Sequence, residues 1–226
     1  MSRKTEFGQR LAMLVLTPVL KFFVHFDVRG KENLKDVPTN MIFVMNHISE
    51  LDVVLLPCTF NIFSKQIAIY YVSFGRDVYK GLKTLRSILF YREGIFQFFG
   101  AYAVELGIRD YDKSLALHID FLKQGKNVAI FPEGGISRPG KIREPKGGVI
   151  ALVKATGLPV VPVLLSGHAN TSAKDFLLRK RKATLTFGKP IYPEELFAGY
   201  ENVEPDKYAE IAKERVVKKV AALFEE

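Results

Sequence analysis

The sequence predicts an α/β protein in which helices flank a mostly parallel β-sheet. Apolar segments of strand length alternate along the chain with segments of helical periodicity, an order that is typical of parallel sheets. A further apolar segment of helical length precedes the first predicted strand. Because no repeat, low-complexity tract or linker interrupts this order, we expect an N-terminal helix over residues 1–25 and one domain over residues 26–226.

The N-terminal segment is predicted to be a helix that associates with a membrane surface. Residues 11–26 are strongly apolar, but Pro18, Lys21 and His25 interrupt them. The segment is shorter than the roughly 20 apolar residues that span a bilayer, and no cleavage site of a secretory signal follows it. Basic residues precede it, as in helices that lie in the bilayer interface. An ordinary buried helix remains the alternative.

Apolar, β-branched and aromatic residues mark the predicted strands. They lie at residues 26–30, 41–45, 66–72, 127–131 and 160–165. The first two flank a polar turn, and the last two have the continuous apolar character of buried strands. Residues 182–187 alternate between apolar and polar side chains, which predicts a further strand at an edge of the sheet.

Three later segments have helical patterns. Residues 110–123 place apolar side chains on one face and stop at Gly125, while residues 146–156 stop at Gly157. Residues 206–224 close the chain with an apolar face that we expect to pack on the core.

Composition narrows the function classes. An excess of 33 basic over 24 acidic side chains gives a net charge of +9, which favours nucleic acid, an anionic membrane or an acidic carrier protein as partner. Cys58 is the only cysteine, and the four histidines lack metal-binding spacing, so we expect no metal site. The absence of GxSxG and GxxxxGK[ST] argues against a serine hydrolase and a P-loop NTPase.

The strongest indication of chemistry lies in residues 46–52, between a predicted strand and a predicted helix. On an unbroken helix, His47 and Asp52 would point about 140° apart. If His47 lies in the turn, the Asp52 carboxylate can reach its imidazole, set the tautomer and leave the other nitrogen as a base. Alternatively, Ser49 and Asp52 form a capping-box pattern, in which Asp52 only closes a helix N-terminus.

A second candidate is the loop that follows the strand at 127–131. It is rich in glycine and contains the basic residues Arg138, Lys141, Arg143 and Lys146. Exposed backbone N–H groups and guanidinium groups both bind phosphate oxygens, and Lys146 lies where a helix N-terminus attracts anions. The pattern predicts an anion site; a flexible, solvated loop is the alternative.

Three motifs together resemble the glycerophospholipid acyltransferase family, especially bacterial 1-acyl-glycerol-3-phosphate acyltransferases. They are Asn46-His47 with Asp52, FPEG at 131–134 and PVVPV at 159–163, and the resemblance covers roughly residues 25–190. It implies transfer of an acyl chain from coenzyme A or acyl carrier protein to the hydroxyl of 1-acyl-glycerol-3-phosphate, which gives phosphatidic acid. It also implies direct attack on the thioester, without an acyl-enzyme or a cofactor.

The resemblance also assigns roles. It implies that His47 is the general base, that Asp52 orients it, and that Glu133 and Gly134 help to hold the acceptor. Two positions depart from the family pattern: Ile136 and Leu106 stand where many members have arginine. We therefore expect Arg138 and Arg109, with Lys141 and Lys146, to bind the acceptor phosphate.

Because such an acceptor lies in the bilayer, we expect residues 1–25 to make this a monotopic protein on the cytoplasmic face of the cell membrane. Its partners would be a lysophospholipid acceptor, an anionic membrane surface and an acyl thioester donor, for which acyl carrier protein is one of the two alternative carriers. The basic run at 179–182 and the net charge would also suit a nucleic-acid binder, but no RRM or zinc-finger signature appears, so we expect no nucleic acid. An acyltransferase for another lysolipid and a non-catalytic lipid-binding protein remain alternatives.

Overall fold

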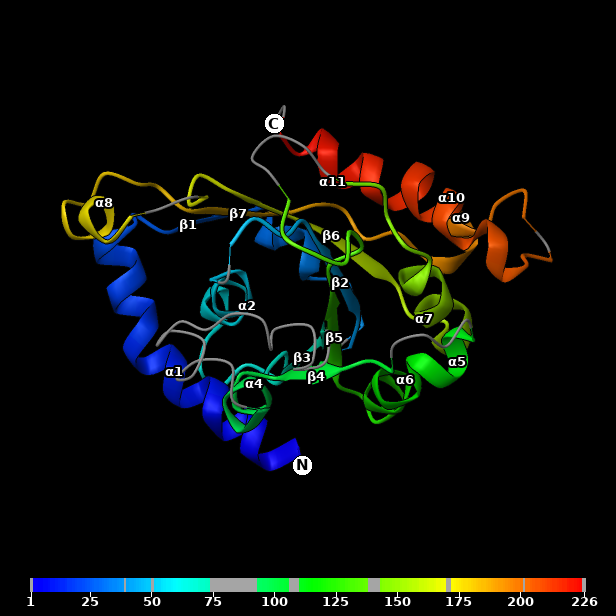
Figure 1. The fold of residues 1–226 in the computed structure, drawn as a ribbon, viewed down its shortest axis with the longest axis horizontal. Coiled ribbons are helices and arrows are strands. Elements are labelled where there is room, and N and C mark those ends of the chain that lie inside the picture. The colour runs from blue at the N-terminus through cyan, green and yellow to red at the C-terminus, as the bar shows by residue number, and fades with distance from the viewer. Residues whose placement is uncertain are drawn as a thin grey trace.

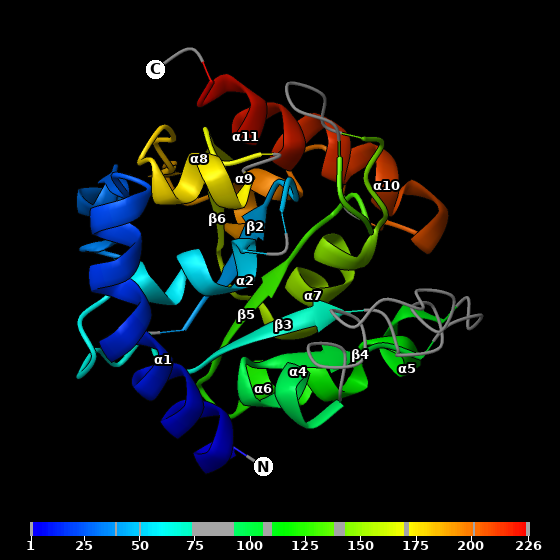
Figure 2. The ribbon, with the colours of Figure 1, turned by 60° about the vertical axis from the view of Figure 1, so that its left-hand side comes forward.

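The computed structural model describes residues 2–38, 40–49, 51–73, 93–105, 110–137, 143–169, 172–200 and 202–224. These residues form a seven-stranded sheet in the order β1-β7-β6-β2-β5-β3-β4, with helices packed on both faces (Figures 1 and 2). The strands are β1 Asp27–Arg29, β2 Ile42–Met45, β3 Ile69–Ser73, β4 Ala101–Ala103, β5 Asn127–Ile130, β6 Val160–Ser166 and β7 Thr184–Phe187.

The helices connect and cover these strands. The α-helices are α1 Ser2–Phe23, α2 Asp52–Leu55, α4 Glu93–Phe98, α5 Tyr111–Ser114, α6 Ala116–Lys123, α7 Gly148–Thr156, α8 Ala173–Leu177, α9 Pro193–Leu196, α10 Tyr208–Ile211 and α11 Lys218–Ala222. Short 3₁₀ segments are η1 Lys31–Leu34, η2 Pro57–Thr59 and η4 Pro205–Lys207, and a π-helical segment, η5 Ala212–Val217, joins α10 to α11.

The sheet is mostly parallel, as predicted. Strands β6, β2, β5, β3 and β4 run in one direction, and the antiparallel pairing of β6 with β7 reverses β7 and its parallel neighbour β1. Every residue of β2 and β5 is buried, because helices cover both faces at the centre of the sheet. Continuous apolar character is what such a position requires.

Some predicted details were wrong. Residues 182–187 do not form an edge strand, since β7 lies between β1 and β6. Its alternation arises because Leu185 and Phe187 point into the core while Thr184 and Thr186 are only partly covered. The predicted helix at 110–123 divides at Leu115 into α5 and α6.

Helix α1 has two different faces. Its inner face buries Met13 and Leu20, and the Gln9 amide donates to the Ile69 carbonyl at 2.6 Å and accepts from its N–H at 2.9 Å. Its outer face exposes large apolar side chains: Phe7, Leu11, Leu14, Val15 and Phe22. The helix thus packs on the domain and still presents an apolar surface. In the described residues no helix is both long and apolar enough to cross a membrane.

His118, buried on α6, predicts an acid-sensitive stability. Burial lowers its pKa to about 4, against weaker opposing bonds to the carbonyls of Tyr71 and Tyr102. Between pH 6.5 and 4 the unfolded chain therefore binds more protons at this residue than the folded protein does. The free energy of unfolding therefore decreases as the pH is lowered across that window. We expect His118→Gln to remove about 3 kcal/mol of this loss, measured by urea unfolding at pH 7 and near pH 4. If wild type and His118→Gln lost the same free energy of unfolding between pH 7 and pH 4, His118 would not be the source of the acid sensitivity.

Candidate active site

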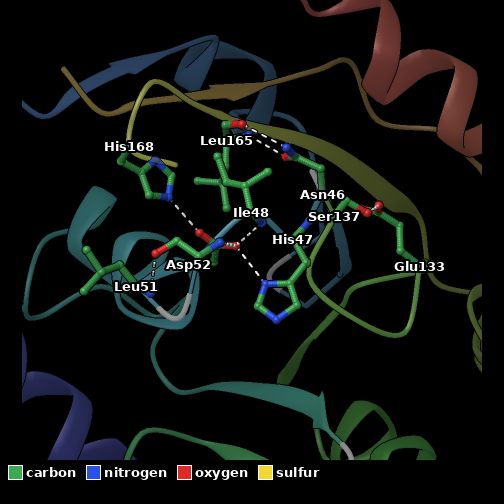
Figure 3. A network of polar contacts seen from close by, with 10 residues as sticks. Asn46, His47, Ile48, Leu51, Asp52, Glu133, Ser137, Leu165 and His168 are labelled. Carbon is green, nitrogen blue, oxygen red and sulfur yellow. Dashed lines mark hydrogen bonds and ion pairs between the residues drawn. The ribbon is translucent and has the colours of Figure 1, made fainter. Parts of the chain in front are cut away.

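The carboxyl ends of three adjacent strands build the site. Strands β6, β2 and β5 are neighbours and run parallel, so the segments that follow them meet at one edge of the sheet. These segments carry His168, His47 and Glu133 respectively (Figure 3). Open α/β sheets commonly place their ligand sites at this edge.

His47 and Asp52 are in direct contact, in the arrangement that their spacing predicted. His47 lies in the turn after β2, Asp52 opens α2, and His47 Nδ1 is 2.8 Å from Asp52 Oδ2 (Figure 3). The same carboxylate oxygen accepts the backbone N–H groups of Ile48 and Ser49 at 2.7 and 3.0 Å. Asp52 therefore both orients the imidazole and closes the turn. The catalytic interpretation and the capping interpretation of the sequence both apply to its carboxylate.

The electrostatics favour an ionised Asp52. The side chain is 0% exposed, and burial acts to raise its pKa, but hydrogen bonds from His168 and His47 outweigh burial and bring the pKa below its usual value. Because a carboxylate only accepts hydrogen bonds, Nδ1 of His47 carries its hydrogen. The His47 ring stacks on Phe131 with centroids 4.2 Å apart, and its side chain is 18% exposed. The other ring nitrogen, Nε2, lies on the side of the ring away from Asp52 and is left as the candidate base (Figure 3).

Glu133 holds the backbone around His47. Its Oε1 accepts the His47 N–H at 3.0 Å, and its Oε2 accepts the Arg143 N–H at 2.8 Å and the Ser137 hydroxyl. The Ser137 N–H in turn donates to the His47 carbonyl at 2.7 Å. Gly134 turns the loop with a φ of 62°. These contacts give Glu133 a positioning role, and its predicted contact with the acceptor stays a prediction.

The structure places some predicted anion-binding residues and not others. Arg138, Lys141 and Arg109 lie outside the described residues, as does Leu106. Lys146 is exposed just before α7, and its N–H donates to the Pro132 carbonyl at 2.8 Å. Their roles in phosphate binding stay predictions. No three His, Cys, Asp or Glu side chains in the described ranges gather into a possible metal site, and metal independence also stays a prediction.

His168 is the site residue that sequence reasoning missed. Its Nε2 is 2.7 Å from Asp52 Oδ1, although 116 positions separate the two residues. The Asn46 side chain fixes the nearby end of β6 by accepting from the Leu165 N–H at 2.7 Å and donating to its carbonyl at 2.9 Å. No local spacing points to His168. The order of the strands would have done so, because it brings the ends of β2 and β6 together.

Comparisons with known proteins agree with the motifs. The family model described as Acyltransferase matches residues 25–166. The chain is 26% identical over 192 residues to 1-acyl-sn-glycerol-3-phosphate acyltransferase BAT2, chloroplastic, of Brassica napus, covering 84% of this chain and 52% of that protein. It thus spans about half the length of the plant protein. A 1-acyl-sn-glycerol-3-phosphate acyltransferase of Borreliella burgdorferi is 24% identical over 196 residues, covering 87% and 72%.

A solved structure shares the fold. The crystal structure of the 1-acyl-sn-glycerophosphate acyltransferase PlsC from Thermotoga maritima matches with a TM-score of 0.57 and 22% identity. The match covers 99% of this chain and 79% of that chain. The likeness extends over the sheet and includes the region of helix α1.

Proposed function

This chain belongs to the acyltransferase family, and we propose that it transfers a fatty acyl chain from a thioester to the free hydroxyl of 1-acyl-glycerol-3-phosphate. The product would be phosphatidic acid. The observation that carries the proposal is the contact of His47 with the buried Asp52 carboxylate at the edge where β6, β2 and β5 end. The names of the relatives from Brassica napus and Borreliella burgdorferi support this acceptor.

The geometry suits general-base catalysis. Nε2 of His47 takes the proton of the acceptor hydroxyl as its oxygen attacks the thioester carbonyl carbon. The new C–O bond forms, the C–S bond breaks, and the leaving thiolate takes the proton back from the imidazolium. Asp52 stabilises the imidazolium and keeps Nδ1 protonated throughout. The proposal includes no acyl-enzyme, metal or cofactor, and the donor is acyl-coenzyme A or acyl carrier protein.

A panel of acceptors tests this function. The purified protein is supplied with acyl-coenzyme A or acylated acyl carrier protein and with lysophosphatidate, lysophosphatidylcholine, lysophosphatidylglycerol or monoacylglycerol in mixed micelles. We expect the highest kcat/KM with lysophosphatidate. A preference for another lysolipid would show that the proposed acceptor is wrong, while the reaction class, acyl transfer, would be retained. Binding of lysolipid without turnover on any acceptor would instead indicate a non-catalytic lipid-binding protein.

Arg138 is predicted to bind the acceptor phosphate, because it lies two residues beyond Ile136 on the glycine-rich loop. A charge-assisted hydrogen bond contributes about 1.5–3 kcal/mol, so Arg138→Ala should lower kcat/KM for lysophosphatidate about ten- to a hundredfold. The loss with monoacylglycerol should be much smaller. Lys123→Ala, which removes an exposed charge at the end of α6, is the control. An equal loss of kcat/KM on both acceptors would indicate that Arg138 binds the acyl donor instead. No loss on either acceptor would indicate that Arg138 is a solvated loop residue.

We also propose that residues 1–25 attach the protein to the cytoplasmic face of the membrane without crossing it. The outer face of α1 exposes Phe7, Leu11, Leu14, Val15 and Phe22. Arg179, which follows α8, lies beside this face: its Nε donates to the Phe22 carbonyl at 2.9 Å, and its guanidinium lies 4.3 Å from the centre of the Phe22 ring. Apolar surface with flanking cations is the usual composition of an interfacial anchor.

Substitutions on the outer face of α1 test the attachment better than a truncation, because removing the helix would uncover the core that Met13 and Leu20 cover. Each fully buried leucine contributes about 1.5–3 kcal/mol, so Leu11→Ser with Leu14→Ser should lower partition into vesicles with anionic lipid at least about tenfold. Leu117→Ser with Tyr192→Ser, at exposed apolar sites outside α1, is the matched control. Unchanged flotation of the α1 variant would contradict the placement.

A further inference from the structure

We propose that His168 is a positioning residue that holds the Asp52 carboxylate in the orientation that His47 needs for catalysis. The inference rests on the proposed function, since it gives His168 a role in that reaction. It is based on how the two oxygens of Asp52 are shared between their donors, and on the loop that brings His168 to them (Figure 3).

The donors of Asp52 are divided between its two oxygens. Oδ2 accepts from His47 Nδ1 and from two backbone N–H groups, while Oδ1 faces His168 Nε2 at 2.7 Å. Asp52 and His168 are 0% and 1% exposed, so bulk water does not substitute for the histidine. In the described residues, His168 is the protein donor to Oδ1.

This contact has a defined direction. An ionised carboxylate only accepts, so Nε2 of His168 carries the hydrogen that lies between the two residues. Rotation of the aspartate carboxylate about χ2 is soft, because this torsion has a broad profile. Donors on both oxygens restrain the rotation, which keeps Oδ2 aligned with Nδ1 of His47. Without His168, a buried carboxylate oxygen would lose its partner, and the carboxylate would be free to turn towards another donor.

The end of β6 is shaped to deliver this histidine. Gly167 has a φ of 84°, and a Cβ at this position would lie 1.8 Å from the Lys182 carbonyl oxygen. Only glycine therefore allows the chain to turn here against the neighbouring segment. His168 Nδ1 lies 3.2 Å from the Ser166 carbonyl, and Asn46 holds Leu165 on the adjoining side. The loop thus fixes the ring at the ends of the same strands that present His47 and Glu133.

Two variants of His168 separate positioning from stability. His168→Leu keeps much of the volume and removes the donor, whereas His168→Gln keeps an N–H near the place of Nε2. A small misplacement of catalytic groups can cost about a hundredfold, so we expect His168→Leu to lower kcat about ten- to a hundredfold with both KM values unchanged. His168→Gln should recover most of this loss. A kcat of His168→Leu within about twofold of wild type would overturn the proposal.

Coupling to Asp52 is the readout that a purely structural role would not move. In an Asp52→Asn background, His168 has no carboxylate to orient, so adding His168→Leu should change kcat less than about threefold. The same loss in both backgrounds, matched by a fall in the folded fraction, would assign His168 to stability alone and overturn the proposal. If His168→Leu does not fold, His168→Met, which also lacks a hydrogen-bond donor, with and without Asp52→Asn gives the same comparison.

A spectroscopic measurement keeps this test independent of the proposed function. In ¹⁵N-histidine-labelled protein, wild type should show His47 protonated at Nδ1 and His168 carrying hydrogen at Nε2. His168→Leu should give His47 a mixture of tautomers, and an unchanged Nδ1–H form would overturn the proposal. A wild-type protein with this pattern and no turnover on lysophosphatidate would instead refute the function and retain the positioning role.

Discussion

His47→Ala is expected to abolish acyl transfer and leave the fold intact. The substitution removes the imidazole that would take the hydroxyl proton, and general-base assistance contributes about 10²- to 10⁴-fold. The side chain is partly exposed and stacks on Phe131 at the surface of the site, so little core volume is lost. Steady-state kcat should fall by at least a hundredfold while circular dichroism and the unfolding midpoint stay close to wild type.

The matched control for His47→Ala is Asp120→Ala, an exposed position on α6 away from the ends of β2, β5 and β6. It should leave kcat and the unfolding midpoint unchanged. If folded His47→Ala retained more than about a tenth of wild-type turnover, His47 would not be the general base.

Asp52→Asn should be almost as damaging, for a different reason. Oδ2 accepts three N–H groups, so the amide oxygen has to occupy that place and the amide NH₂ then faces His168. Two N–H donors would meet there unless the His168 ring changes tautomer. The neutral amide also stabilises a His47 imidazolium poorly, so we expect kcat to fall about 10²- to 10⁴-fold.

Stability distinguishes this loss from that of His47→Ala. Asp52 is buried and ionised among its donors, so Asp52→Asn should also destabilise the fold by about 1–3 kcal/mol, measured by urea unfolding. Asp52→Glu keeps the charge and serves as the control for geometry, since its longer side chain moves the carboxylate away from Nδ1. Wild-type kcat in Asp52→Asn would show that the carboxylate has no part in the reaction.

The contact of His47 with Asp52 was predictable because it is local. A histidine in a strand-to-helix turn and an aspartate in the next turn can meet only in a few ways, and the residues between them set the distance. The central strands were equally accessible, since burial on both faces leaves a continuous apolar run at β5 and β6. The local sequence pattern was sufficient to predict these features because contacts between nearby residues, or burial of the strand itself, determine them.

Other features depend on the order of the strands and could not be read locally. His168 reaches Asp52 only because β6 pairs beside β2. The Glu133 carboxylate binds backbone and side-chain donors of the two loops, which no local pattern reveals. The alternating sequence of β7 resembles that of an edge strand. In β7 one face is only partly covered, and in an edge strand a neighbouring strand is missing, but both situations produce the same sequence pattern.

The most direct test of the proposed reaction compares two products in one assay. Wild-type protein is mixed with an acyl thioester and lysophosphatidate, and free thiol and phosphatidic acid are measured together by thiol titration and mass spectrometry. Direct transfer predicts one thiol for each phosphatidic acid, with no thiol released when the acceptor is omitted. Thiol release without phosphatidic acid would contradict the account by showing thioester hydrolysis, and the absence of both products would contradict it by showing that the site does not turn over.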